Sequence, residues 1–166
     1  DGSIAAPTAG LHFTKKLLDD FTISKDFITL HVGLGTFLPV KSKNIDDHDM
    51  HEESYFINSK TLKKIQDVKR NGNRILSIGT TSLRAIESLA IDTNQVNKWS
   101  KTNLFITEGF DFKFTDCLLT NFHLPKSTLL ILISSFLGYE LTMKCYKIAL
   151  KEKFRFYSYG DAMLIL

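Results

Sequence analysis

The stretch from residue 74 to residue 90, RILSIGTTSLRAIESLA, constrains the fold more than any other part of the chain. It begins with the short apolar run that is typical of a buried strand, and it continues with apolar residues at helical spacing. We therefore predict a strand that ends at Gly79 and passes directly into a helix. Gly79 permits a tight turn or a close approach of the backbone to a ligand, and a hydroxyl at Thr81 or Ser82 would cap the helix.

The turn at residues 79–82 is a candidate anion-binding site. The first amides of a helix point outward, and the positive end of the helix dipole favours a carboxylate or a phosphate. Arg84 lies one turn into the helix and would add a bidentate clamp. The predicted ligand contacts are Gly79, Thr80, Thr81, Ser82 and Arg84. The alternative is a well-capped connection within an α/β core.

A second strand-to-helix junction lies in residues 116–137, DCLLTNFHLPKSTLLILISSFL. We predict that a short strand ends in the first half of this segment and that a helix begins near Ser127. Asn121, His123 and Lys126 would then gather at the N-terminus of this helix. If the two predicted strands are neighbours in one sheet, the two junctions lie side by side.

A third turn follows a predicted strand over residues 27–32 and contains Gly33 and Gly35. The G-x-G pattern alone does not indicate a dinucleotide-binding fold, because the third glycine is absent and Pro39 prevents the helix that would receive the pyrophosphate. The remaining interpretation is a flexible turn beside His31, suited to a backbone that lies close against a ligand.

The rest of the chain predicts one α/β unit. Strands and helices alternate after Ser59, which favours a mixed, largely parallel sheet with flanking helices. The other expected elements are a short helix over residues 14–21 with Leu17 and Leu18 inward, a helix over residues 59–70 capped near Asn58 or Ser59, a polar loop over residues 91–101, a hairpin or two edge strands over residues 104–114, a helix over residues 140–151 with Leu141, Cys145 and Ile148 inward, and a strand, turn and strand over residues 155–166.

Residues 44–55, NIDDHDMHEESY, place His48 and His51 three apart among several carboxylates. A metal site would use such groups, but the segment lacks the H-E-x-x-H order and a cysteine partner. A solvated acidic turn and the polar wall of a ligand cleft are the alternatives, and a buried carboxylate here would serve as an acid or base. Cys117 and Cys145 form no C-x-x-C motif, which favours two core residues in a reducing cytoplasm.

The chain has 166 residues, 43% of them hydrophobic and 23% charged, which is enough for one globular domain with a core. Its net charge of +3 allows an RNA partner without requiring one. No signal peptide is visible, and the longest apolar run, residues 128–137, is too short to cross a bilayer. Because the chain begins at Asp1, we expect a processed product or a part of a longer protein.

Several long motifs in order resemble one family, the S-adenosylmethionine:tRNA ribosyltransferase-isomerases of queuosine biosynthesis. The glutamate of the third motif can be matched at Glu52 or at Glu53. The motifs are AAPTAGLHFT at residues 5–14, TLHVGLGTF at 29–37, HDMHEE at 48–53, IGTTSLRAIES at 78–88, LLTNFHLPKSTLL at 118–130 and FYSYGDAMLI at 156–165.

The resemblance implies an enzyme that moves the ribosyl part of S-adenosylmethionine, a co-substrate, onto 7-aminomethyl-7-deazaguanine in tRNA. The product would be epoxyqueuosine, with release of adenine and methionine. The methionyl carboxylate would lie at residues 79–82 with Arg84, and the nucleoside at Gly33 and Gly35. The implied acid and base groups are His31, His51, Glu52, His123 and Asp161, the tRNA contacts are Asn121 and Lys126, and no metal or membrane is expected.

Members of this family are roughly twice as long as this chain. The resemblance thus implies that residues 1–166 are the C-terminal half of a catalytic domain, without the N-terminal portion and an inserted β-rich domain. The N-terminal half would be a partner. The alternatives are an inactive remnant that keeps at most nucleotide or RNA binding, and a generic nucleotide-binding α/β module.

Overall fold

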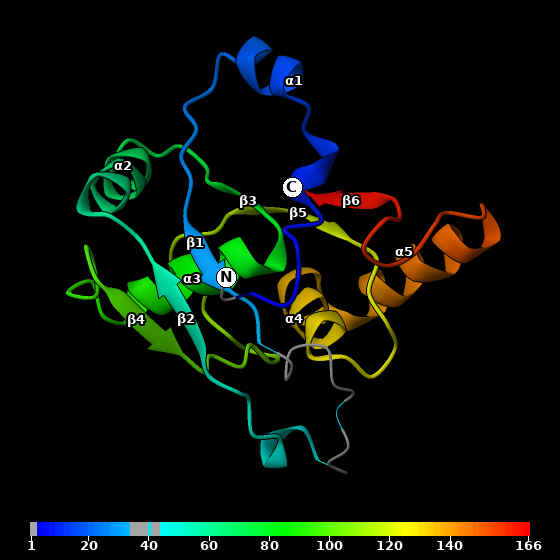
Figure 1. The fold of residues 1–166 in the computed structure, drawn as a ribbon. Helices are drawn as coiled ribbons and strands as arrows, with labels where there is room; N and C mark the ends of the chain where they lie inside the picture. Colours follow the sequence, from blue (N-terminus) through cyan, green and yellow to red (C-terminus); the bar gives the residue numbers. More distant parts are fainter. Residues whose placement is uncertain (1–2, 34–39, 41–43) are drawn as a thin grey trace.

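The structure is a computed structural model that describes residues 3–33, residue 40 and residues 44–166 (Figure 1). It confirms the α/β class. The helices are η1 Gly10–His12, α1 Lys15–Asp20, η3 Ile45–Asp47, α2 Ser59–Arg70, α3 Thr80–Ile91, α4 Thr128–Leu137 and α5 Tyr139–Lys151, and the strands are β1 Thr29–His31, β2 Glu53–Phe56, β3 Leu76–Ile78, β4 Trp99–Thr102, β5 Cys117–Asn121 and β6 Ala162–Ile165.

The described strands form two small sheets instead of one. Strands β1, β2 and β4 pair antiparallel, whereas the other sheet has the order β3-β5-β6. In that sheet β3 and β5 are parallel and β5 and β6 are antiparallel. The prediction of a largely parallel sheet is therefore wrong, since β3–β5 is the one parallel pair among the described strands. After α5 a loop leads directly into β6. A parallel pairing of β6 with β5 would need a further crossover, usually a helix, to bring the chain back to the other end of the sheet.

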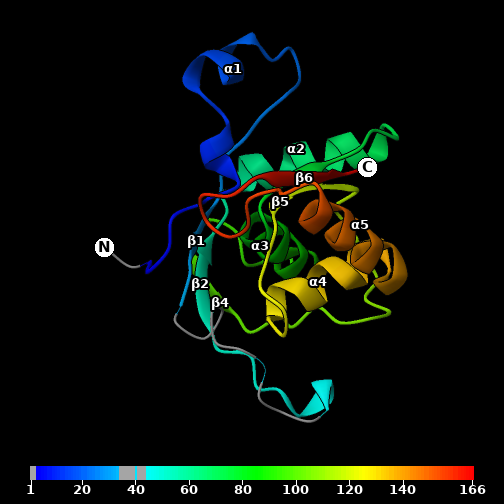
Figure 2. The same ribbon diagram turned by 90° about the vertical axis from the view of Figure 1, so that its right-hand side faces the viewer.

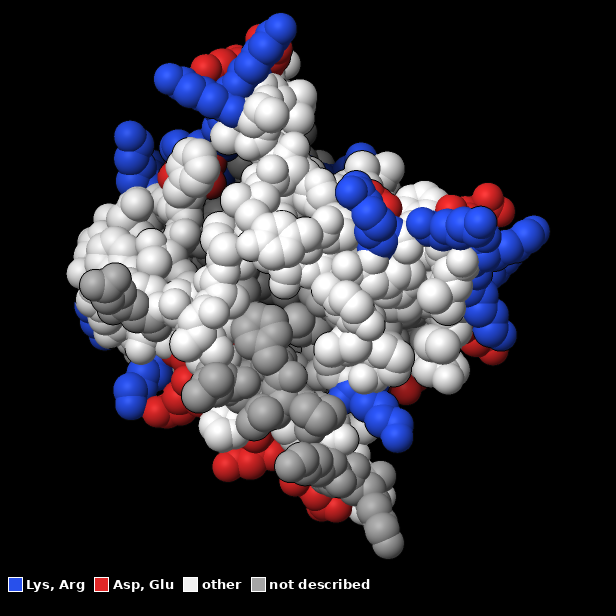
Figure 3. Space-filling model, turned by 45° about the vertical axis from the view of Figure 1, so that its right-hand side comes forward, with Lys and Arg blue, Asp and Glu red and all other residues white. Residues whose placement is uncertain are grey.

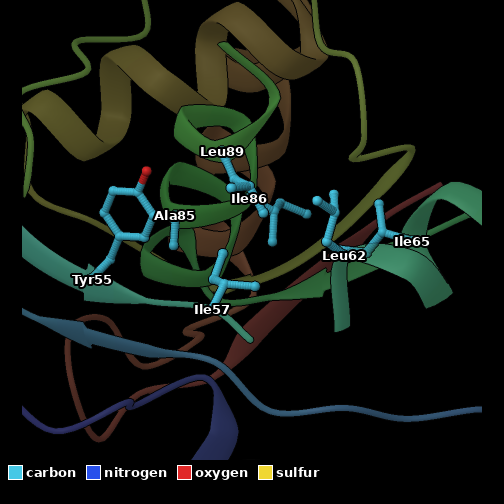
Figure 4. Close-up of a cluster of buried hydrophobic side chains, with 7 residues drawn as sticks. All are labelled: Tyr55, Ile57, Leu62, Ile65, Ala85, Ile86 and Leu89. Carbon is cyan, nitrogen blue, oxygen red and sulfur yellow. The ribbon is translucent and has the colours of Figure 1, made fainter. Parts of the chain in front are cut away.

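Helix α3 lies at the centre of the molecule. It runs beside the antiparallel sheet and beneath β5 and β6, with α4 and α5 on its other side (Figure 2). One core cluster joins it to β2 and α2 through Tyr55, Ile57, Leu62, Ile65, Ala85, Ile86 and Leu89 (Figure 4). A second cluster joins it to β5, α4 and β6 through Leu83, Ile106, Leu118, Leu132, Ile133 and Ile165. The buried residues of α3 also include the charged Arg84 and Glu87, which need partners inside the protein.

The predicted hairpin over residues 104–114 contains no strand. The predicted polar loop is confirmed over residues 92–98, and its last three residues belong to β4. The buried Glu87 of α3 explains the first difference. Its carboxylate accepts hydrogen bonds from the backbone amides of Lys113, Phe114 and Thr115 at 2.8, 3.1 and 2.7 Å. Because this carboxylate already accepts their hydrogen bonds, these amides do not require partners on a neighbouring strand. Phe110 and Phe112 pack against the second core cluster, as their apolar character requires.

The two best-capped helices agree with prediction. Asn58 caps α2 by accepting from the amide of Thr61 at 2.8 Å, and Ser127 caps α4 by accepting from the amide of Leu130 at 3.1 Å. In α1, however, Leu17 is exposed, so its predicted burial is wrong.

The predicted inward face of α5 is also wrong. Thr142, Tyr146 and Ala149 are buried, whereas Leu141 and Ile148 are about half exposed, at 47% and 50%. The chain turns by 115° between α4 and α5. This turn directs the Tyr146 face of α5 onto Phe122, at a ring distance of 5.3 Å. No single helix among the described residues is long and apolar enough to span a membrane, although the bent pair of α4 and α5 has sufficient length and apolar composition together.

A buried ion pair joins β2 to α3. Arg84 donates through Nη1 to a carboxylate oxygen of Glu53, and the side chains of both residues are almost completely buried. Arg84 also donates through Nε to the carbonyl of Leu104 at 3.1 Å, and the second oxygen of Glu53 accepts from the amide of Gly33 at 3.0 Å. One pair of charges thus connects three segments to the central helix.

We expect Glu53→Ala to lower the free energy of unfolding by about 3–5 kcal/mol, because it leaves the Arg84 charge buried without a carboxylate. Urea denaturation followed by circular dichroism measures the effect. Glu52→Ala is the matched control, since Glu52 forms an exposed pair with Lys101 and its loss should cost less than about 1 kcal/mol. Equal losses in the two variants would contradict a structural role for the buried pair.

Candidate functional site

A cavity of about 250 Å³ lies where the two strand-to-helix junctions meet. Strands β3 and β5 pair in parallel, with Ile78 opposite Leu119, so both junctions leave the same edge of the sheet. The N-terminal loop and the loop before β6 close the other sides. The lining residues are Ala5 to Gly10, Val32, Ile78 to Thr81, Thr120, Asn121, His123, Leu124, Ser127, Leu129, Tyr157 and Ser158.

The first turn of α3 opens onto this cavity. Its N-cap is Gly79, which has φ 91° and ψ 147°, and no side chain caps the helix. The predicted cap from Thr81 or Ser82 is therefore wrong. A glycine is required at this φ because a side chain there would be strained, and the amide of Gly79 extends the β3–β5 pairing by donating to Leu119 O at 2.8 Å. The first amides of α3 consequently have no side-chain acceptor and remain able to bind an anion.

Gly79, Thr80 and Thr81 line the cavity, whereas Ser82 and Arg84 do not. Arg84 is paired with Glu53, and its Nη2 is buried without a hydrogen-bond partner among the described residues. The guanidinium thus stabilises the fold through its pair with Glu53. Because it does not line the cavity, this geometry does not support its predicted contact with a bound anion. Charges this deeply buried need a partner inside the protein.

Asn121 holds the walls of the cavity together. It is 2% exposed, accepts from the hydroxyl of Thr8 at 3.1 Å, and lies with its Nδ2 at 3.3 Å from both Gly160 O and a ring nitrogen of His12. It therefore ties β5 to the N-terminal loop and to the loop before β6. Asn121 thus positions these loops, and its predicted contact with tRNA stays a prediction.

His123 also lines the cavity. Its Nε2 lies 2.9 Å from Thr120 Oγ1, and its backbone amide donates to the hydroxyl of Tyr146 at 3.0 Å. Burial lowers the pKa of His123 to about 4. The imidazole is therefore neutral at pH 7, a form that can accept a proton.

The other predicted site residues that the structure describes do not line the cavity. His31 of β1 packs its ring against Trp99, Gly33 donates to Glu53, and His51 is exposed. Glu52 pairs at the surface with Lys101, so Glu53 is the buried carboxylate of the HDMHEE motif. Lys126 is exposed and has φ 60°. Asp161 pairs with Arg155, whose hydrogen bonds lower the pKa of this carboxyl. Gly35 lies outside the described residues.

Some lining residues were absent from the predicted site. Residues 5–10 entered the prediction only as part of the AAPTAGLHFT motif, and Thr120, Ser127, Tyr157 and Ser158 received no ligand role. The loop carries a recognisable signal in its Pro and Gly residues, whereas the others come together only through folding. Among the described residues, no group of three or more His, Cys, Asp or Glu side chains is arranged to hold a metal ion.

Comparison with known proteins agrees with this architecture. The family model described as "Queuosine biosynthesis protein" matches residues 1–165. Two curated relatives carry the name S-adenosylmethionine:tRNA ribosyltransferase-isomerase. The protein of Caldanaerobacter subterraneus subsp. tengcongensis is 49% identical over 170 residues, and that of Thermosipho melanesiensis is 51% identical over 167 residues. The matches cover 100% and 99% of this chain but 50% of each relative, so the chain spans about half the length of these proteins.

The crystal structure of an S-adenosylmethionine tRNA ribosyltransferase from Thermotoga maritima is also similar, with a TM-score of 0.75 and 38% sequence identity. The similarity covers 96% of this chain and 51% of that protein. The match to the family model is almost complete, and the resemblance that the sequence motifs indicated is confirmed. The chain belongs to the queuosine biosynthesis family of S-adenosylmethionine:tRNA ribosyltransferase-isomerases.

Proposed function

We propose that this chain forms the C-terminal half of a catalytic domain that transfers and isomerises the ribosyl moiety of S-adenosylmethionine. The acceptor is 7-aminomethyl-7-deazaguanine in tRNA, the product is epoxyqueuosine, and adenine and methionine are released. The observation that carries the proposal is the cavity at the open N-terminus of α3 in a chain of this family. The reaction takes place in the cytoplasm, where tRNA is modified.

The proposal assigns the remaining part of the catalytic unit to a second half. The relatives are about twice as long as this chain, and the β3-β5-β6 sheet has one face that is only partly covered. Leu76 and Leu164 lie on that face and are 39% and 50% exposed. Apolar side chains on an open sheet face favour a further layer of protein.

The first turn of α3 is the proposed site of the methionyl carboxylate. Its amides have no side-chain cap, the helix dipole is positive there, and Thr80 and Thr81 line the cavity. The walls at Ala5, Ala6 and Leu129 are apolar and suit the uncharged parts of the nucleoside.

His123 is the proposed proton acceptor within this cavity. The reaction requires a base that removes a proton from the carbon beside the sulfonium. His123 has the unprotonated form that this step needs, and its low pKa makes it a weak base. The pKa of about 4 means that His123 would not supply the acid for the departing adenine at pH 7. His31, His51, Glu52 and Asp161 remain candidates for that second role, but none of them lines the cavity in this half of the protein.

Thr80→Pro tests the carboxylate site. Proline is well tolerated at the first position of a helix, and it removes one amide from the proposed anion site. We expect the affinity for S-adenosylmethionine, measured by isothermal titration calorimetry, to fall roughly tenfold or more because a hydrogen bond to a charged group is lost. An analogue of S-adenosylmethionine without the carboxylate should bind more weakly to the unchanged chain and should not respond to the substitution.

Helix α5 supplies a matched control. It also begins after a glycine with positive φ, Gly138 at 89°, and it also lacks a side-chain cap. Tyr139→Pro therefore makes the same backbone change outside the cavity and should leave the affinity unchanged. Thr80→Val keeps the amide and controls for the lost hydroxyl. Equal affinities for Thr80→Pro and Tyr139→Pro would contradict the carboxylate site.

The buried imidazole also predicts a pH dependence of stability. The folded pKa of His123, about 4, lies below the ordinary value of 6.5. The unfolded chain therefore binds this proton more readily, and the contribution to stability is lost as the pH falls from 6.5 to 4. Complete loss amounts to about 3 kcal/mol in the free energy of unfolding.

Urea denaturation over this pH range should show the loss in the unchanged chain and not in His123→Gln, which keeps a polar group near Thr120 but does not titrate. His51→Gln changes an exposed histidine and should behave like the unchanged chain. A His123→Gln variant with the full pH dependence would show that the imidazole is not held in its neutral form.

A further inference from the structure

We propose that residues 154–161 and the adjoining lysines of α5 form an RNA-docking surface beside the cavity. Tyr157 and Tyr159 would stack on unpaired bases, and Lys144, Lys147 and Lys151 would contact phosphates. The inference rests on the proposed function, because it assumes that the acceptor base reaches the cavity within an RNA.

Hydrogen bonds and an ion pair close the loop that carries the tyrosines at its two ends. Asp161 accepts from the backbone amide of Arg155 at 2.8 Å and pairs with its guanidinium at 2.9 Å, while the amide of Asp161 donates to Arg155 O at 2.8 Å. Gly160 packs so closely against this turn that a Cβ would clash with the carbonyl oxygen of Arg155. Interactions at both ends thus close the loop, and little conformational entropy remains to be lost when a partner binds.

The loop is also anchored to the core. The ring of Phe156 lies 5.1 Å from that of Phe122 and 5.9 Å from that of Tyr146, and the amide of Tyr157 donates to Phe122 O at 2.9 Å. Asn121 lies within hydrogen-bond distance of Gly160 O on the cavity side. The loop therefore keeps a fixed position relative to the cavity.

Two aromatic side chains project from this anchored loop. Tyr159 is 88% exposed, and Tyr157 is 54% exposed and lines the cavity. Two exposed aromatic rings on a loop anchored beside a pocket are suited to hold a splayed base, because recognition of single-stranded RNA depends on stacking with aromatic side chains.

The preceding helix supplies positive charge. Lys144, Lys147 and Lys151 follow the helical spacing of three and four residues, so they share one face of α5, opposite the buried Thr142, Tyr146 and Ala149. None of the three lysines forms an ion pair within the described residues. Figure 3 shows Lys and Arg side chains gathered at the right-hand end of the molecule, where α5 lies, with fewer Asp and Glu among them.

The other lysine-rich helix is less suited to this role. Helix α2 lies at the opposite side of the molecule from α5 (Figure 1). Two of its lysines are already paired, Lys64 with Asp26 at 2.9 Å and Lys69 with Asp116 at 2.6 Å. Exposed aromatic groups in the loop that follows a helix with lysines unpaired among the described residues favour RNA over an acidic protein as the partner of α5 and its loop.

The first test measures binding of a fluorescently labelled RNA hairpin by anisotropy, with a fully paired RNA of equal length as comparison. Tyr159→Ala should weaken binding of the hairpin roughly five- to hundredfold, and Tyr159→Phe should restore it, because stacking requires the ring and not the hydroxyl. Binding of the paired RNA should change little. Tyr139→Ala removes a tyrosine that is 67% exposed at the start of α5 and serves as the control.

The second test compares two matched pairs of lysines. Lys144→Gln with Lys147→Gln should lower the slope of log affinity against log salt by about 1.5, because two phosphate contacts are lost. Lys60→Gln with Lys63→Gln makes the same change at the same spacing on α2, at exposed positions without an ion pair within the described residues, and should leave the slope unchanged.

The outcomes separate this inference from the proposed function. If the unchanged chain binds the hairpin and the α5 and Tyr159 variants match their controls, the docking surface is wrong while RNA binding stands. If the unchanged chain binds S-adenosylmethionine but no hairpin, the surface is again wrong and the cofactor site stands. If S-adenosylmethionine does not bind but the hairpin binding shows the expected losses, the surface stands and the proposed cofactor site is wrong.

Discussion

The candidate site depends on the parallel pairing of β3 with β5. Two strands that run in the same direction end at the same edge of a sheet, and each of these strands is followed by a turn and a helix. The amide of Gly79 continues the pairing by one residue, since it donates to Leu119 O at 2.8 Å. The open first turn of α3 is thereby held opposite Asn121 and His123. Antiparallel pairing would have put the two turns at opposite ends of the sheet.

Buried charged side chains of α3 position the loops around the paired strands β3 and β5. Arg84 contacts the carboxylate of Glu53 and the carbonyl of Leu104, and Glu87 accepts from three backbone amides of residues 113–115. These contacts satisfy backbone groups that would otherwise be buried without partners. Irregular segments can therefore lie against the core without forming strands. The same charge that we predicted to bind a ligand, Arg84, is used to maintain the fold.

Family membership and architecture support one another. The relatives match this chain along almost its whole length, and most of the motifs that indicated the family contribute residues to the cavity. The loop at residues 5–10, the turn at Gly79 and the segment from Thr120 to Ser127 all contribute to its walls. FYSYGDAMLI contributes Tyr157 and Ser158 and continues into β6. The HDMHEE motif lies apart from the cavity and supplies Glu53 to the buried ion pair.

The sequence by itself determined the elements whose signals are local. Helix α2 has the predicted bounds and a predicted cap at Asn58, and the strand-to-helix junctions occur at Gly79 and before Ser127, as predicted. Capping, apolar spacing and the effects of glycine and proline operate within a few residues, so one sequence is enough to detect them. The family was also readable, because several long motifs occur in order.

Only the tertiary structure decided which groups meet. The predicted inward face of α5 was wrong. The prediction chose Leu141, Cys145 and Ile148 because they are more apolar than Thr142 and Ala149. The turn after α4 instead directs the Tyr146 face onto Phe122. Residues distant in sequence also decide other features of the site. They bury Glu53 but leave Glu52 exposed, pair Arg84 with Glu53 and not with a ligand, and bury Asn121. The energies of ion pairs and of buried hydrogen bonds depend on partners and on burial, and neither is encoded in local spacing.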